Sequence, residues 1–131
     1  MKLFYNDYGA EGAGVKSDKV YNLVSGFLAS GVPIDGVGLQ MHISVDQYPS
    51  PADVSANMKR LVALGLEVHV TEMDVRCQGC TADRLTLQAK VYGDMLQACL
   101  DNLKPTHPSG KGGCKSFETW GFTDKHTWIG A

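Results

Sequence analysis

Strand-like and helix-like segments alternate along the chain, and this alternation constrains the fold more than any other feature. Short apolar or β-branched runs are separated by longer segments whose apolar residues recur every three or four positions. We expect strands at 3–5, 34–42, 68–76 and 116–120, with helices that Ser17, Ser50 and Thr81 cap or begin. The order βαβαβαβ with short connections predicts one parallel sheet with right-handed crossovers, and therefore an α/β fold.

The apolar residues of each expected helix have the spacing of one buried stripe. We expect these stripes to consist of Val20, Leu23, Val24, Phe27 and Leu28, then Val54, Met58, Leu61 and Val62, then Leu85, Ala89, Tyr92, Leu96, Cys99, Leu100 and Leu103. The glycine-rich segment at 11–14 has no phosphate-loop pattern and is expected to be a flexible turn.

The third expected strand ends in two acids. Val68 and Val70 favour a strand, and Glu72 and Asp74 follow at the same period of two, so all four are expected on one face. The carboxyl ends of parallel strands are where α/β barrels keep their chemistry. A strand end with solvated acids is the alternative.

Two neighbouring carboxylates repel each other and need a hydrogen-bond donor if they are desolvated. His42, with Gln40 beside it, ends the preceding expected strand and can supply that donor. A hydrogen bond to the charged form keeps a carboxylate ionised. The alternative for His42 is a core histidine that a backbone carbonyl satisfies.

Length and composition narrow the class of protein. A chain of 131 residues with 44% hydrophobic content suits one globular domain. A net charge of -2 gives no basic face for nucleic acid, and no apolar run is long enough to span a membrane. No secretory leader is visible, and the immediate start on a strand suggests further sequence upstream. Four strands and three helices make half of a (β/α)₈ barrel, which typically needs about 250 residues.

Four segments carry a family resemblance: Asn-Asp-Tyr at 6–8, the run 33–42, Val-Thr-Glu-Met-Asp at 70–74, and Trp-Gly-Phe-Thr-Asp-Lys at 120–125 followed by Trp128. They resemble, in order and spacing, the C-terminal half of the family 10 glycoside hydrolases, the (β/α)₈-barrel endo-1,4-β-xylanases. The resemblance covers nearly the whole chain. It implies that residues 1–131 are a partial catalytic domain containing barrel strands five to eight.

The resemblance also implies roles for individual residues. Glu72 matches the nucleophile of a retaining mechanism, His42 matches the histidine that hydrogen-bonds it, and Asp74 matches the acid that orients that histidine. The positions matching the substrate cleft are Asn6, Tyr8, Gln40, Trp120 and Trp128. The implied ligand is xylan or a xylo-oligosaccharide, with no cofactor or metal, and the parent enzyme is expected to be secreted. Either tryptophan could instead plug the barrel mouth.

The sequence departs from the family in one respect. Retaining hydrolysis needs a second carboxyl group as acid/base, which the family carries in a Trp-Asp-x-x-Asn-Glu segment, and this sequence has no such segment. We therefore expect little or no xylanase turnover from the isolated chain. The alternative function is a non-catalytic half-barrel that binds xylan. Arg76 is expected to form a loop ion pair, and no role is assigned to Glu118.

The sequence contains four cysteines, and the expected half-barrel has two strand edges without a partner strand. The even count and the resemblance imply disulfides Cys77–Cys80 and Cys99–Cys114, with a zinc site of Cys77, Cys80, Cys114 and His107 as the competing interpretation. A redox role for the Cys-x-x-Cys pair is disfavoured, because no helix starts directly after a strand there. Exposed strand edges pair readily with other chains, so a homodimer through the half-barrel edges is expected.

Overall fold

The computed structural model describes residues 1–129, and all of their side chains except that of Asp124. The elements are β1 (Phe4–Asp7), α1 (Val15–Ala29), β2 (Gly36–Leu39), β3 (His42–Ser44), α2 (Pro51–Ala63), β4 (Glu67–Arg76), α3 (Ala82–Leu100), β5 (Gly113–Thr119) and the short 3₁₀ helix η1 (Asp124–His126). Within the described residues, no helix is long and apolar enough to cross a membrane.

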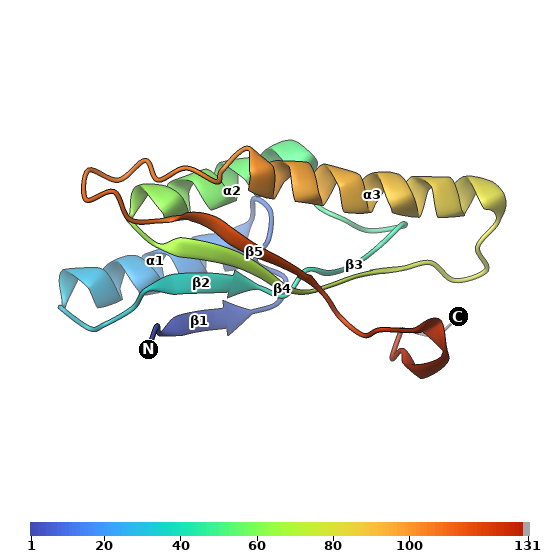
Figure 1. The fold of residues 1–131 in the computed structure, drawn as a ribbon, viewed down its shortest axis with the longest axis horizontal. Helices are drawn as coiled ribbons and strands as arrows, with labels where there is room; N and C mark the ends of the chain where they lie inside the picture. The colour runs from blue at the N-terminus through green and yellow to red at the C-terminus, as the bar shows by residue number, and fades with distance from the viewer. Residues whose placement is uncertain (130–131) are drawn as a thin grey trace.

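The strands form one parallel sheet, as the alternation predicted. β1 pairs with β2, β2 pairs with the first part of β4, and β5 pairs with the other edge of β4. β3 continues the line of β2 and pairs with the last residues of β4, with His42 opposite Asp74. The parallel β/α units form part of a (β/α)₈ barrel, and the carboxyl ends of β2, β3 and β4 meet at one end of it (Figure 1).

The expected single strand over 34–42 is interrupted. β2 ends at Leu39 and β3 begins at His42, because Met41 takes a left-handed backbone conformation with φ 65°. An extended ladder cannot continue through such a residue. Sequence patterning shows only that residues 34–42 favour a strand, so it could not place this break.

β4 contains an irregularity that corrects the predicted faces. Its register with β5 shifts between Val70 and Met73. Val68 and Val70 are fully buried against the helices, and so is Met73, although it lies an odd number of residues from them. Glu72 and Asp74 therefore lie on the opposite face from Val68 and Val70, and the prediction of one shared face was wrong. A bulge adds one residue to a strand and reverses the alternation beyond it.

The helices cover one face of the sheet, with α2 and α3 side by side (Figure 1). The core between the layers contains Val24, Met58, Leu61 and Met95 with the valines of β4. Several residues of the expected stripes are nevertheless exposed: Leu23, Leu28, Leu85, Ala89, Leu96, Leu100 and Leu103. They lie on α1, on α3 and just beyond α3. In the strand order these helices stand on either side of α2, so each has a helical neighbour on one side only.

The helix starts follow capping chemistry in two cases of three. The hydroxyls of Ser50 and Thr81 accept hydrogen bonds from the N–H groups of Asp53 and Arg84. Ser17 does not cap α1, because the helix begins two residues earlier at Val15 and Ser17 is buried within its first turn. Its hydroxyl donates to the carbonyl of Gly14 instead.

Both expected disulfides are present. Cys77 pairs with Cys80 in the loop after β4, and Cys99 at the end of α3 pairs with Cys114 in β5. These pairings exclude the alternative zinc site, because Cys114 is bonded to Cys99. The second bridge ties the last helix to the last strand, so it restrains the packing of the α3–β5 unit.

The two disulfides should differ in their effect on stability. The Cys99–Cys114 bridge spans a sequence separation of 15, whereas Cys77–Cys80 spans 3. Replacing Cys99 and Cys114 with alanine should lower the free energy of unfolding by about 3 kcal/mol, because the longer loop regains more entropy when unfolded. The Cys77→Ala/Cys80→Ala variant is the matched comparison and should lose about 1 kcal/mol less. Urea unfolding measures both, and equal losses would contradict the loop-length argument.

Candidate active site

The site is built around His42, which lies between two carboxylates. Its Nδ1 is 3.0 Å from Oδ1 of Asp74, and its Nε2 is 3.4 Å from Oε2 of Glu72. The pairing of β3 with β4 sets this arrangement, because it places His42 directly opposite Asp74. The contact with Asp74 is a hydrogen bond, and the contact with Glu72 is a close approach between a ring nitrogen and a carboxylate oxygen. The chain thus brings together the three residues that the resemblance assigned to catalysis.

Glu72 is also held from the β1 side. Asn6 donates from Nδ2 to Oε1 of Glu72 at 3.1 Å, and the Thr71 hydroxyl donates to Oδ1 of Asn6 at 3.0 Å. The Thr71 bond fixes which way the Asn6 amide points, with its N–H₂ toward the carboxylate. Hydrogen bonds to the ionised form of a carboxylate stabilise that form. The side chain of Glu72 keeps 18% of its surface accessible, so a substrate atom could reach it.

Asp74 is the buried anchor of the site. It is 3% exposed, and its Oδ2 accepts a 2.6 Å hydrogen bond from Nε1 of Trp128. The Trp128 ring stands edge-on to the His42 ring at a centroid distance of 5.2 Å, and Trp120 does so at 6.3 Å. Both tryptophans keep more than half of their surface exposed in this chain. Flat exposed rings beside the acids suit the apolar faces of sugars.

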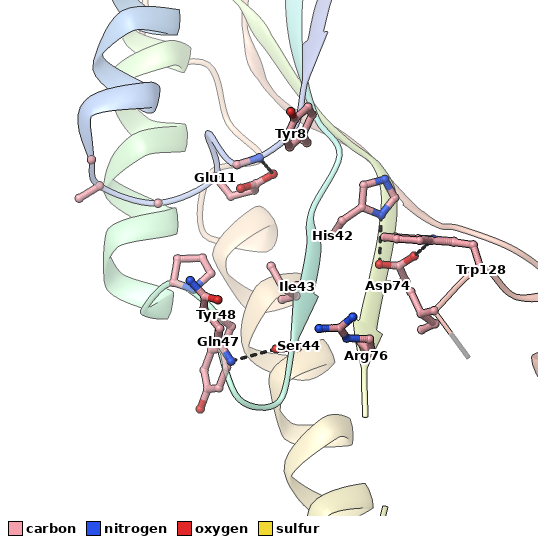
Figure 2. A pocket seen from close by; sticks show the side chains of 16 residues that line it. Tyr8, Glu11, His42, Ile43, Ser44, Gln47, Tyr48, Asp74, Arg76 and Trp128 are labelled. Atoms are coloured by element: carbon pink, nitrogen blue, oxygen red, sulfur yellow. Dashed lines mark hydrogen bonds and ion pairs between the residues drawn. The ribbon is translucent and has the colours of Figure 1, made fainter. Parts of the chain in front are cut away.

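A pocket of about 740 Å³ opens next to this array (Figure 2). Its walls come from the loop after β1, the β3 segment with its following turn, the end of β4, and the C-terminal segment. The polar and aromatic lining residues that matter here are Tyr8, Glu11, His42, Asp74, Arg76 and Trp128. The pocket therefore includes His42 and Asp74 of the array but is not lined by Glu72, and it lies at the carboxyl ends of the strands.

Tyr8 is held over the pocket by a charge pair. Nζ of Lys16 lies 3.8 Å from the centre of the Tyr8 ring and 2.9 Å from Oδ1 of Asp7. Burial by itself would raise the pKa of Asp7, but hydrogen bonds from Lys16, the N–H of Tyr8 and the Tyr5 hydroxyl lower the pKa below its ordinary value of 3.8. The hydrogen bond to Asp7 raises the pKa of Lys16. The two charged groups stabilise each other and hold the Tyr8 ring in place.

The lowered pKa of Asp7 predicts a pH dependence of stability. A carboxylate whose pKa is lower in the folded state stabilises the fold above its unfolded pKa, and this contribution is lost as the pH falls through the folded pKa. The difference in free energy of unfolding between wild type and Asp7→Asn should therefore be largest above about pH 5. It should shrink as the pH falls below 3.8, the ordinary pKa of an aspartate. Urea unfolding at pH 6 and pH 3 measures this. The Lys16→Met background should weaken the dependence, and a pH-independent difference would contradict the assignment.

The remaining expected residues are placed less centrally. Gln40 follows β2 and is half-buried, and its backbone N–H donates to the carbonyl of Asp7. Within residues 1–129, no hydrogen bond joins its side chain to Glu72 or His42. Arg76 lines the pocket and forms no ion pair within 4 Å in the described part of the chain, although its charge is one of the smaller causes that lower the pKa of Asp46. Glu118 accepts a hydrogen bond from Ser116 on the inner face of β5.

Sequence reasoning missed Glu11. The glycine-rich segment that contains it was expected to be a flexible turn, yet Glu11 is 5% exposed and lines the pocket. Its Oε1 accepts hydrogen bonds from the backbone N–H groups of Gly9 and Met41. No pattern within the sequence signals a contact across that distance. Glu11 lies in a glycine-rich segment that has neither helical nor strand periodicity, so the sequence pattern did not indicate that it would be buried.

Parallel β/α units with acids and aromatic rings at the carboxyl ends of the strands are features of part of a (β/α)₈ barrel, and those strand ends are where such barrels keep their active sites. Comparison with known proteins gives the particular family. The profile of Glycosyl hydrolase family 10 matches residues 1–131, so the chain belongs to that family. This agrees with the resemblance carried by the four sequence segments.

Individual relatives agree with this assignment. The chain is 42% identical to endo-1,4-beta-xylanase B of Neocallimastix patriciarum, over 99% of this chain and 14% of that protein. It is 39% identical to endo-1,4-beta-xylanase B of Thermotoga neapolitana, over 97% of this chain and 34% of that protein. The xylanase of Bispora sp. MEY-1 solved with xylobiose superposes with a TM-score of 0.86 at 33% identity, covering 98% of this chain and 36% of that one. The chain therefore spans about a third or less of these relatives.

Proposed function

We propose that this chain is the nucleophile-bearing part of a retaining endo-1,4-β-xylanase, with residues 1–131 acting as one partial catalytic domain. Glu72 would attack the anomeric carbon of a xylose unit and form a glycosyl-enzyme that water then hydrolyses. The observation that carries the proposal is the position of Glu72, between the amide of Asn6 and the imidazole of His42. The xylobiose in the Bispora xylanase supports a xylo-oligosaccharide as the ligand.

The surrounding residues would divide the remaining work. His42 and Asn6 would orient the carboxylate of Glu72, and Asp74 would hold His42 and the indole of Trp128 in place. Tyr8, Trp120 and Trp128 would bind the sugar rings, since all three are largely exposed beside the array. Gln40 would contribute a polar group at the end of β2. The proposal requires no cofactor.

The second carboxyl group of a retaining mechanism is the part that this sequence lacks. Such a group lies about 5 to 5.5 Å from the nucleophile and protonates the leaving oxygen. The Trp-Asp-x-x-Asn-Glu segment that carries it in this family is not in the sequence. We propose that the chain alone releases little sugar from xylan, because an alkoxide leaving group needs that proton.

The test uses a substrate that does not need the missing acid. A dinitrophenyl xylobioside has a good leaving group, so Glu72 alone should release dinitrophenol from it. We expect a burst of dinitrophenol and no measurable sugar from xylan under the same conditions. The alternative function, a non-catalytic xylan-binding half-barrel, predicts saturable binding of xylobiose without release of dinitrophenol. Calorimetry with xylobiose separates that outcome from a chain that does not bind at all.

We also propose that two copies associate through their open edges. Among residues 1–129, β1 and β5 each have one strand neighbour, and exposed leucines line the adjoining helices on both sides. A twofold axis along the barrel would place β1 beside the partner's β5 with the strands still parallel. Sedimentation velocity at micromolar concentration should give a dimer, and a folded monomer at every concentration tested would refute the pairing.

For the parent enzyme, we propose secretion. Two disulfides are typical of proteins that work in oxidising surroundings. The family alone does not decide this, because one similar solved structure is described as an intracellular xylanase of Thermoanaerobacterium saccharolyticum.

A further inference from the structure

The backbone of Met41 is held in a conformation that its side chain disfavours. It is the one non-glycine residue with positive φ among residues 1–129, at 65°, and its side chain is fully buried. The left-handed region crowds the Cβ atom of an unbranched residue such as methionine, so surrounding contacts must hold it there. Met41 directly precedes His42, so its dihedral angles set where β3 begins.

Glu11 supplies the contact. Its Oε1 accepts the N–H of Met41 at 3.1 Å and the N–H of Gly9 at 2.9 Å, across 30 residues of sequence in the first case. The residue is 5% exposed, and a buried carboxylate persists only when hydrogen bonds replace its lost hydration. Figure 2 shows Glu11 near Tyr8 in the loop after β1, with its carboxylate turned back toward a backbone N–H of that loop. The carboxylate thus joins the β1 loop to the break between β2 and β3.

The segment that carries Glu11 is itself anchored. Asn57 of α2 is 4% exposed and donates from Nδ2 to the carbonyls of Ala10 at 2.8 Å and Glu11 at 3.1 Å. Nε of Arg60 donates to Oδ1 of Asn57 and fixes the direction of that amide. A Cβ on Gly12 would lie 2.5 Å from Cβ of Pro49, so the chain passes tightly over the turn after β3. The Glu11 carboxylate is therefore attached to the rigid helix layer.

Met41 is bonded on its other side to the strand that carries the acids. Its carbonyl accepts the N–H of Asp74 at 3.3 Å. With Glu11 on its N–H and Asp74 on its carbonyl, the Met41 peptide groups have fixed directions. His42 then starts β3 directly opposite Asp74.

We propose that Glu11 is a positioning residue: by accepting the Met41 N–H it keeps the left-handed turn, and the turn places the His42 imidazole between Glu72 and Asp74. Glu11 touches neither the nucleophile nor the substrate in this role. The catalytic meaning of the proposal rests on Glu72 being the nucleophile. The geometry of the turn does not depend on that assignment, and it can be measured without enzymatic turnover.

Two conservative variants separate acceptor geometry from charge. Glu11→Gln loses the charge but keeps an oxygen at the same reach, whereas Glu11→Asp keeps the charge on a side chain one methylene shorter. We expect Glu11→Gln to resemble wild type. Glu11→Asp should shift the ring ¹⁵N resonances of His42 and the indole N–H resonance of Trp128, and should speed hydrogen exchange of the Met41 amide roughly tenfold or more.

Asn102→Ala is the matched control, because it removes a buried side chain whose hydrogen bonds within the described residues go to Ala98 and Ser55, and not to Glu11, Asn57 or Met41. It should lower stability while leaving the His42 and Trp128 resonances at their wild-type positions. If Glu11→Asp also leaves them unchanged, or if Glu11→Gln shifts them as much as Glu11→Asp does, the proposal is wrong.

A kinetic readout distinguishes this proposal from the proposed function. If wild type releases dinitrophenol, Glu11→Asp should slow release roughly 10- to 100-fold with little change in xylobiose affinity, because misplacing a catalytic array costs rate more than binding. If wild type releases none, the nucleophile assignment fails, while the resonance shifts still decide whether Glu11 sets the turn.

Discussion

Glu72→Gln will slow the release of dinitrophenol from the activated xylobioside on the order of 10⁴-fold or more. A loss of this size is typical when a nucleophile is removed. The amide has nearly the shape of the carboxylate but does not attack the anomeric carbon. Its amide oxygen can still accept the hydrogen bond from Asn6, so the fold and the xylobiose affinity should change little. Stopped-flow absorbance measures the rate, and calorimetry measures the affinity.

Glu118→Gln is the matched control for that variant. Glu118 is another carboxylate on the inner face of the sheet, but it accepts a hydrogen bond from the Ser116 hydroxyl and does not contact His42. We expect it to keep the wild-type rate. Equal rates for Glu72→Gln and wild type would show that another group carries the reaction.

Replacing Asp74 with alanine should have the second largest effect, on stability and on rate together. Its two oxygens accept from Nδ1 of His42 and Nε1 of Trp128, and the side chain is almost fully buried. The change leaves two donors without an acceptor, each costing roughly 1 to 3 kcal/mol, so the free energy of unfolding should fall by about 2 to 6 kcal/mol. His42 also loses the partner that orients it, and release of dinitrophenol should slow roughly 100-fold.

Asp46→Ala provides the comparison for Asp74→Ala. Asp46 forms a two-pronged pair with Arg84, but it is exposed to solvent, where ion pairs contribute little to stability. Urea unfolding of the two variants should therefore separate them clearly, and the indole N–H resonance of Trp128 should move only in Asp74→Ala. Equal stability losses in the two variants would mean that the buried network does not hold the site together.

The sequence predicted the order of elements and the parallel sheet, because hydrophobic periodicity and capping residues act locally. It also predicted that His42, Glu72 and Asp74 would meet, but the reasoning about β4 was incomplete. The alternation that put Val68 and Glu72 on one face holds only for a regular strand, and the shift between Val70 and Met73 reverses it. A bulge depends on the pairing with β5, which local sequence does not encode.

The same limit explains what was missed around Met41. A methionine gives no sign that its backbone is left-handed, and the contact with Glu11 comes from a segment 30 residues away. The leucines of α1 and α3 show the limit in another form, since apolar spacing identifies a stripe but not how many neighbours cover it. Long-range packing decides both features.

Covalent trapping tests the central claim, that Glu72 is a nucleophile aimed at a sugar, more directly than any rate. A 2-fluoro-xylobioside with a dinitrophenyl leaving group forms a slowly hydrolysed glycosyl-enzyme, which mass spectrometry detects and peptide mapping locates. We predict one adduct per chain, on the peptide containing Glu72, and none in Glu72→Gln. An adduct on another carboxylate, or no adduct at reagent concentrations that saturate binding, would contradict the account.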